Sequence, residues 1–176
     1  RTTAEATRYD TTGRYAEAVA LCDALQATHA GRARCDRFGT SPEGRPMVAL
    51  VASADGVLDP VSARAKGRPS IVLQGGIHAG EIDGKDAGFE VLREALAGGA
   101  GREGLASTTL VFIPVLNVDG HERFGPCKRP QQRGPRDCGW RTTAQNLNLN
   151  RDFTKAEAPE TQALLDSLVE SLPTAR

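Results

Sequence analysis

The sequence lacks the features of a membrane protein and of a protein that binds its partners through bulk charge. It contains no apolar run of about 18 residues, so we expect no transmembrane helix and no membrane partner. Its 22 basic and 22 acidic residues give a net charge of zero, which argues against a nucleic-acid partner. No signal peptide is visible. Because the chain begins at Arg1 and not at Met, we expect a processed or trimmed N-terminus.

Cysteine is scarce, and its four copies fall into two close pairs. We expect disulfides Cys22–Cys35 and Cys127–Cys138, and the second would order the polar stretch 128–137, which has little core of its own. An even number of closely paired cysteines is typical of an oxidising compartment and indicates a periplasmic or secreted protein. The alternative is four free thiols in a cytosolic protein. Zinc binding by cysteine is disfavoured, because no Cys-x-x-Cys pair occurs.

What the sequence does contain is the composition of one globular domain. Hydrophobic residues make up 39% of it and charged residues 25%, and 176 residues are enough for a single domain with a core. Strand patterns alternate with helix patterns, which predicts an α/β sandwich with a mixed sheet. The expected helices are 13–27, with Thr12 as its cap, 84–96 and 159–172; the expected strands are 34–38, 47–52, 71–74 and 108–115, with a loop over 55–68.

The stretch Gly76-Ile77-His78-Ala79-Gly80-Glu81 is a candidate metal site. His78 and Glu81 lie on a glycine-rich turn at the end of an expected strand, where α/β folds place ligands, and can point at one cation. Zinc binds imidazole nitrogen at about 2.0–2.1 Å and carboxylate oxygen at about 2.0–2.2 Å. The alternative is a surface turn with a solvated glutamate, since a His-x-x-Glu pair often occurs by chance.

Three further elements follow this turn in order. They are Asn117-Val118-Asp119-Gly120, then Arg141, then Asn148-Leu149-Asn150-Arg151. In order and rough spacing, the four elements resemble the zinc carboxypeptidase family, the carboxypeptidase A-like metallopeptidases, from about Phe38 to about Leu172. The resemblance implies a mixed β-sheet with helices on both faces. The turn at Asn117 is interpreted as architecture near the site.

The resemblance also implies a role for each matched residue. His78 and Glu81 would hold Zn2+, and Arg141 would stabilise the oxyanion that develops on the scissile carbonyl. Asn150 and Arg151 would clamp the terminal carboxylate of a peptide, for which the planar fork of an arginine is well suited. Two alternatives stay open: an Arg–Asp pair with Asp152 in place of the clamp, and a neighbouring arginine, Arg133 or Arg136, in place of Arg141.

Asn148 is a departure from the family pattern. The family has an aspartate here, which accepts the second ring N–H of the metal-binding histidine. An asparagine oxygen can accept the same bond, but it carries no charge. We therefore expect a less basic imidazole at His78 and a lower affinity for the metal.

Two parts of the family's active site are not found. The third zinc ligand is a histidine beyond the Asn-Arg motif, and the general base is a glutamate further on; His29 and His121, the other histidines, both precede Asn150. We therefore expect residues 1–176 to be the N-terminal half of a catalytic domain, apparently truncated, with the missing C-terminal half as its partner. Such a chain should bind metal weakly or not at all, and should expose a sheet edge and an apolar patch.

These observations favour a zinc-dependent metallocarboxypeptidase that hydrolyses C-terminal amino acids from peptides with a free terminal carboxylate. One alternative is an N-acyl-amino-acid deacylase of the aspartoacylase or succinylglutamate-desuccinylase type, which shares His-x-x-Glu and an Asp-Leu-Asn-Arg-like motif. Another is a non-catalytic peptide-binding module that keeps the scaffold without a working centre. The segment after Glu81 and the expected disulfides favour the peptidase.

Overall fold

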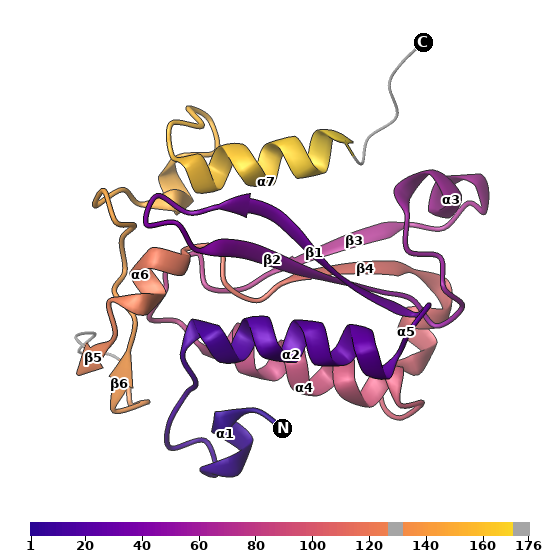
Figure 1. The fold of residues 1–176 in the computed structure, drawn as a ribbon, viewed down its shortest axis with the longest axis horizontal. Coiled ribbons are helices and arrows are strands. Elements are labelled where there is room, and N and C mark those ends of the chain that lie inside the picture. Colours follow the sequence, from indigo (N-terminus) through magenta and orange to yellow (C-terminus); the bar gives the residue numbers. More distant parts are fainter. Residues whose placement is uncertain (127–131, 171–176) are drawn as a thin grey trace.

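A computed structural model of the chain describes residues 1–126 and 132–170, with side chains as far as residue 168. The main sheet has the strand order β1-β2-β4-β3; β1–β2 and β2–β4 are antiparallel, and β3–β4 is parallel (Figure 1). The strands are β1 (Ala33–Thr40), β2 (Pro46–Ala52), β3 (Ser70–Gln74), β4 (Thr109–Ile113), β5 (Gly125–Pro126) and β6 (Asp137–Cys138). The helices are α1 (Thr3–Ala6), α2 (Tyr15–Thr28), α3 (Pro60–Ala65), α4 (Asp83–Leu96), α5 (Arg102–Ser107), α6 (Val118–Glu122), η1 (Leu149–Arg151) and α7 (Pro159–Glu170).

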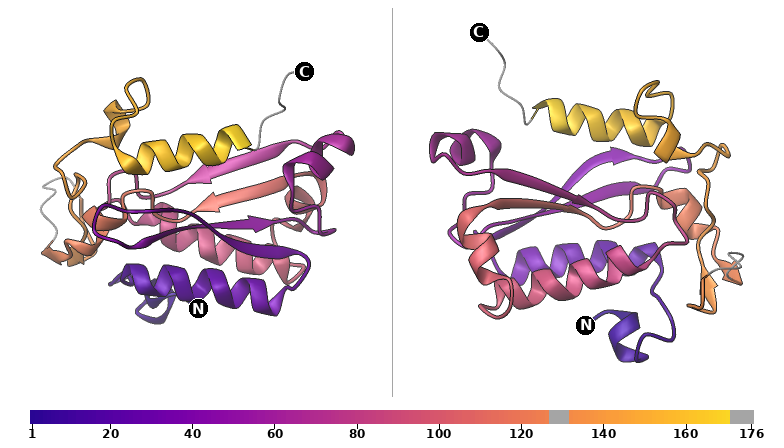
Figure 2. Two further views of the ribbon diagram at one scale, coloured as in Figure 1. Left: turned by 45° about the horizontal axis from the view of Figure 1, so that its top comes forward. Right: turned by 180° about the vertical axis from the view of Figure 1, so that it is seen from behind.

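Helices cover both faces of the sheet, as predicted. Helices α2 and α4 lie on one face and α7 on the other, in every view (Figures 1 and 2). Strand β2 is central and is buried on both faces from Met47 to Ala52, which explains its continuous apolar sequence. Helix α4 turns Phe89 inward, where its ring packs edge-to-face on Phe112 of β4 with centroids 5.3 Å apart. The α/β fold with a mixed sheet is therefore confirmed.

Two local predictions are wrong. Thr12 does not cap α2, because its hydroxyl donates 2.6 Å to Asp86 Oδ2 and the helix begins two residues later than predicted, with Arg14 at the N-cap. Residues 55–68 are not all loop, because α3 forms there. Asp59 caps it by accepting from Ser62 N at 2.8 Å, and Pro60 occupies its first turn. The short helices α1 and α5 were also not predicted.

One of the two expected disulfides lies wholly among the described residues and is present. It joins Cys22 of α2 to Cys35 of β1, with Cα atoms 5.5 Å apart. The bond therefore fastens a helix to the sheet it covers, and the free-thiol alternative is wrong for these two cysteines. The other expected pair, Cys127–Cys138, involves Cys127, which lies outside the described residues.

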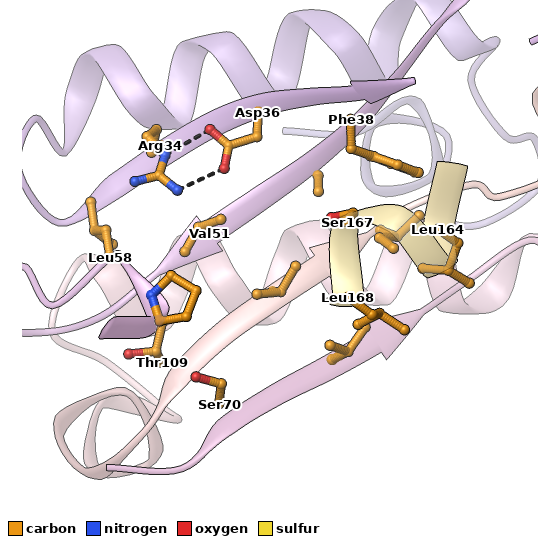
Figure 3. A pocket seen from close by; sticks show the side chains of 15 residues that line it. Arg34, Asp36, Phe38, Val51, Leu58, Ser70, Thr109, Leu164, Ser167 and Leu168 are labelled. Atoms are coloured by element: carbon orange, nitrogen blue, oxygen red, sulfur yellow. Dashed lines mark hydrogen bonds and ion pairs between the residues drawn. The ribbon is translucent and has the colours of Figure 1, made fainter. Parts of the chain in front are cut away.

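Strand β3 forms an edge of the sheet, with Ile71 41%, Val72 37% and Leu73 48% exposed. Successive side chains of a strand point to opposite faces, so both faces of β3 reach solvent. A groove of about 550 Å³ lies beside this edge on the α7 side, with Leu164 and Leu168 of α7 in its wall (Figure 3). The expected apolar edge and patch are therefore present.

No helix among residues 1–126 and 132–170 is long and apolar enough to cross a membrane.

Candidate functional site

The candidate site lies where the parallel strands β3 and β4 end. Gly75 N donates to Ile113 O at 2.8 Å and Asn117 N donates to Gly76 O at 3.0 Å, so the turns after the two strands are fastened together. Gly76 has a φ of 58°, and a Cβ there would lie 3.0 Å from Val115 Cα. A glycine is therefore needed for the close approach of the two turns.

His78 and Glu81 converge on this turn, as their spacing predicts. Glu81 N donates to His78 O at 2.9 Å, and His78 Nδ1 lies 3.1 Å from Glu81 Oε1. The histidine side chain is only 9% exposed, whereas the glutamate side chain is 44% exposed. The ring is therefore held by the protein while the carboxylate reaches solvent. Metal binding by this pair stays a prediction.

Asn148 faces the other ring nitrogen of His78. Its Oδ1 lies 3.1 Å from His78 Nε2 and also accepts from Asn150 N at 3.1 Å. A neutral imidazole has a single N–H. If Nε2 donates that proton to Asn148, the lone pair of Nδ1 points toward the Glu81 carboxylate, and a cation bound between them would contact both. A metal-binding histidine uses this arrangement, in which the second ring N–H is donated to a protein oxygen.

Arg141 lies beside the same carboxylate. Its Nη1 is 4.0 Å from Glu81 Oε1, and its backbone oxygen accepts from Asn117 Nδ2 at 3.2 Å. The segment that carries Arg141 passes close to the turn that bears His78 and Glu81, because a Cβ on Gly139 would lie 2.7 Å from Ala79 O. Asn117 and Gly139 thus set where Arg141 enters the site, which agrees with the interpretation of the Asn117 turn as architecture.

Asn150 and Arg151 lie next to this cluster, in η1. Arg151 is exposed, and its Nη1 donates to the backbone oxygen of Asn150 at 2.8 Å. No ion pair joins Arg151 to Asp152 among the described residues. Asp152 instead accepts from the backbone N–H groups of Glu157 and Ala158, at 3.0 and 2.9 Å. The Arg–Asp alternative is therefore not supported, and the clamp stays a prediction.

Sequence reasoning missed one contact with the turn that carries His78 and Glu81. Gln132 Nε2 donates to Gly80 O at 2.9 Å, so the loop before β6 rests on the turn between the two candidate ligands. A Cβ on Gly80 would lie 2.8 Å from Gly139 O, which makes a larger residue difficult to accommodate there. Gly80 and Gly139 were the available signal in the sequence, because a glycine permits a close approach of two backbone segments.

A sequence profile of the zinc carboxypeptidases matches residues 18–170. The chain belongs to the zinc carboxypeptidase family. It is 32% identical over 183 residues to carboxypeptidase D of Mus musculus, covering 86% of this chain and 13% of that protein.

Two solved structures share the fold of this zinc carboxypeptidase chain. Carboxypeptidase A from Helicoverpa armigera matches with a TM-score of 0.69 and 19% identity, covering 92% of this chain and 43% of the other. The metallo-carboxypeptidase from Burkholderia cenocepacia matches with a TM-score of 0.62 and 22% identity, covering 86% and 36%. This chain therefore spans only part of the length of the relatives it matches.

His78 and Glu81 are compatible in chemistry with zinc binding. His78 and Glu81 offer one nitrogen and one carboxylate, the donor types that zinc uses. Within residues 1–126 and 132–170, no group of three or more His, Cys, Asp or Glu side chains is placed to hold a metal ion. His29 is the C-cap of α2, and His121 lies within α6 and is buried. The described residues therefore fit zinc through two donors.

Proposed function

We propose that this chain is part of a zinc-dependent metallocarboxypeptidase that hydrolyses C-terminal amino acids from peptides. The arrangement around His78 supports this most directly: its two ring nitrogens face Glu81 and Asn148, and Arg141 lies beside the same glutamate. Membership of the zinc carboxypeptidase family supports the reaction class. The third zinc ligand and the general base would lie outside residues 1–176.

His78 and Glu81 would hold the zinc ion. Zinc bound there would supply a Lewis acid for the scissile carbonyl and would lower the pKa of a bound water. Asn148 would accept the Nε2 proton of His78, which fixes the tautomer with its Nδ1 lone pair free. Arg141 would donate to the carbonyl oxygen as negative charge develops on it.

Asn150 and Arg151 would hold the terminal carboxylate of the substrate. The exposed guanidinium of Arg151 has no carboxylate partner among the described ion pairs, so its two parallel N–H groups are available to a ligand. Selection of a free carboxylate would make the enzyme an exopeptidase. We also propose a periplasmic or secreted location, which the Cys22–Cys35 disulfide supports.

A substrate panel tests the proposed function. Active protein that contains this chain is supplied with zinc and then with N-blocked dipeptides, the same peptides amidated, and N-acyl amino acids. We expect zinc-dependent hydrolysis of the free-carboxylate peptides only. Preferential hydrolysis of N-acyl amino acids would indicate a deacylase, and absence of both bound zinc and hydrolysis would indicate a non-catalytic binding module.

Replacement of Asn148 by aspartate is expected to strengthen zinc binding by about 10-fold, within the range that partners of metal-binding histidines contribute. The carboxylate would still accept from His78 Nε2, and its charge would make the imidazole a stronger donor. Isothermal titration with zinc measures the change. Asn146→Asp is the matched control, because Asn146 is exposed and contacts Arg123 at 3.3 Å, away from His78. Equal affinities for the two variants would contradict the role of Asn148.

A further inference from the structure

Residues 1–14 precede the part of the chain that matches the family, and they are fastened to two helices that begin at the candidate site. Helix α4 starts directly after the turn that carries His78 and Glu81, and α6 starts after Asn117. Figure 1 shows α1 packed below α2 and α4. The outer attachment is an ion pair in which Arg93 of α4 donates two bonds of 2.7 Å to the Glu5 carboxylate.

The inner attachment, at residues 12–15, combines the Thr12–Asp86 hydrogen bond of 2.6 Å with a closed ring of polar contacts, which we call the His121 ring. Lys85 Nζ donates to Gly13 O at 2.6 Å and lies 3.4 Å from His121 Nε2. His121 Nδ1 lies 3.2 Å from Glu122 Oε1, and that oxygen accepts from Tyr15 N at 2.9 Å. Because Gly13 and Tyr15 are two residues apart in sequence, the contacts close on the same short segment. His121 is the bridge between α4 and α6.

While Lys85 is charged, only one protonation state of His121 satisfies the ring. The side chains of His121 and Lys85 are 1% and 2% exposed, so water offers no ready substitute for a lost partner. With its proton on Nδ1, the neutral imidazole donates to Glu122 and accepts from the Lys85 ammonium through Nε2. A second proton, on Nε2, would place two cationic donors 3.4 Å apart. Protonation therefore breaks the bridge.

Other charges around the ring act on the same equilibrium. Lys85 Nζ lies 3.6 Å from Asp86 Oδ1, and Arg14 pairs with Glu122 at 2.8 Å. Burial lowers the pKa of Lys85, and the charges of Asp86, Glu17 and Glu122 oppose this. Burial lowers the pKa of His121; the bond to Glu122 opposes this, and the Lys85 charge adds to it. Burial raises the pKa of Asp86, so its protonation has the opposite sign.

The direction of the pH effect follows from the His121 shift. A folded-state pKa below the ordinary value of 6.5 means that the open state binds more protons than the closed state. The contribution of His121 is therefore complete above that value and is lost as the pH falls through its folded-state pKa. The outer attachment is not lost with it, because the hydrogen bond from Arg93 lowers the pKa of Glu5 to about 2.

We propose that the His121 ring is an acid-sensitive latch, which opens the junction at residues 12–15 when His121 becomes protonated. Opening leaves Glu5 paired with Arg93 and so is local. It removes the link that ties α4 to α6, the two helices that follow Glu81 and Asn117. Acid would thereby loosen the support of the candidate site without unfolding the domain.

Amide exchange of Tyr15 tests the latch, because its N–H donates to Glu122 within the ring. Exchange is followed by NMR on the full chain from about pH 8 to about pH 5, alongside the ring signals of His121. After correction for intrinsic exchange, the opening constant should rise by up to about tenfold per pH unit below the ordinary histidine pKa. The rise should begin near the ordinary histidine pKa and level off at the lower pH where His121 of the closed state titrates. The Glu5 amide, which donates to Thr2 Oγ1 at 3.1 Å beside the outer attachment, should show no such rise.

Two variants separate the latch from a static packing role. His121→Gln keeps an acceptor for Lys85 and a donor for Glu122 but cannot titrate, so its Tyr15 opening should lose the rise on acidification that the parent chain shows. Asp86 is retained, so the difference from the parent chain isolates His121. His29→Gln, at the end of α2, should keep the pH dependence. If His121→Gln fails to fold, the parent chain decides: a His121 titration at or above the ordinary value, or a Tyr15 opening constant that does not rise between the ordinary histidine pKa and that titration, would overturn the latch.

Discussion

Arg151→Ala is expected to weaken hydrolysis of peptides with a free terminal carboxylate by about 30-fold to several thousand-fold, measured as kcat/KM in active protein that contains this chain. That range corresponds to loss of one side of a desolvated, two-bond charge pair, about 2–5 kcal/mol. Amidated peptides should be nearly unaffected, because they offer no carboxylate. The side chain is exposed and donates only to its neighbour's backbone oxygen in the described structure, so its removal should cost little stability.

The interpretation of Arg151→Ala depends on comparing its effect on free-carboxylate peptides with its effect on amidated peptides. Arg102→Ala is a suitable control, because Arg102 is exposed in α5 and lies away from η1. It should leave both substrates unchanged. An equal loss on free and amidated peptides in Arg151→Ala would show that Arg151 supports the fold and does not clamp the carboxylate.

The parts of the fold that the sequence predicts are those governed by burial. β2 reads as a continuous apolar run because both of its faces are covered, and α4 places Phe89 at helical spacing on its buried face. Thr12 shows where local reasoning fails. It has the chemistry of a helix cap, but its hydroxyl bonds Asp86, 74 residues away in sequence. A tertiary partner of that kind leaves no local signal.

The candidate site likewise has contacts that the local sequence predicts and contacts that only the tertiary structure shows. Convergence of His78 and Glu81 could be predicted because a three-residue spacing on one turn is a local property. The resemblance to a family placed Asn148 near His78, which their separation of 70 residues in sequence could not. Lys85 and His121, 36 residues apart, belong to no motif that names their contact. The His121 ring is therefore a property of the tertiary fold, which brings Lys85 of α4 and His121 of α6 into contact.

Arg141→Ala is expected to lower kcat by about 10²–10³-fold, the usual cost of removing one donor to a developing oxyanion, with little change in KM. The charge that Arg141 would stabilise forms mainly in the transition state, whereas Asn150 and Arg151 would bind the substrate before reaction. Steady-state kinetics with one free-carboxylate peptide separate the two parameters. Zinc content measured on the same samples excludes loss of metal as the cause.

The structure also provides the control for this prediction. Among Arg133, Arg136 and Arg141, the described contacts place Arg141 beside Glu81, with Nη1 and Oε1 4.0 Å apart. Arg136→Ala should therefore leave kcat almost unchanged. Arg141→Lys should recover only part of the loss, because an ammonium keeps the charge but not the planar fork. A large fall in kcat for Arg136→Ala, with a normal kcat for Arg141→Ala, would show that Arg136 and not Arg141 stabilises the oxyanion.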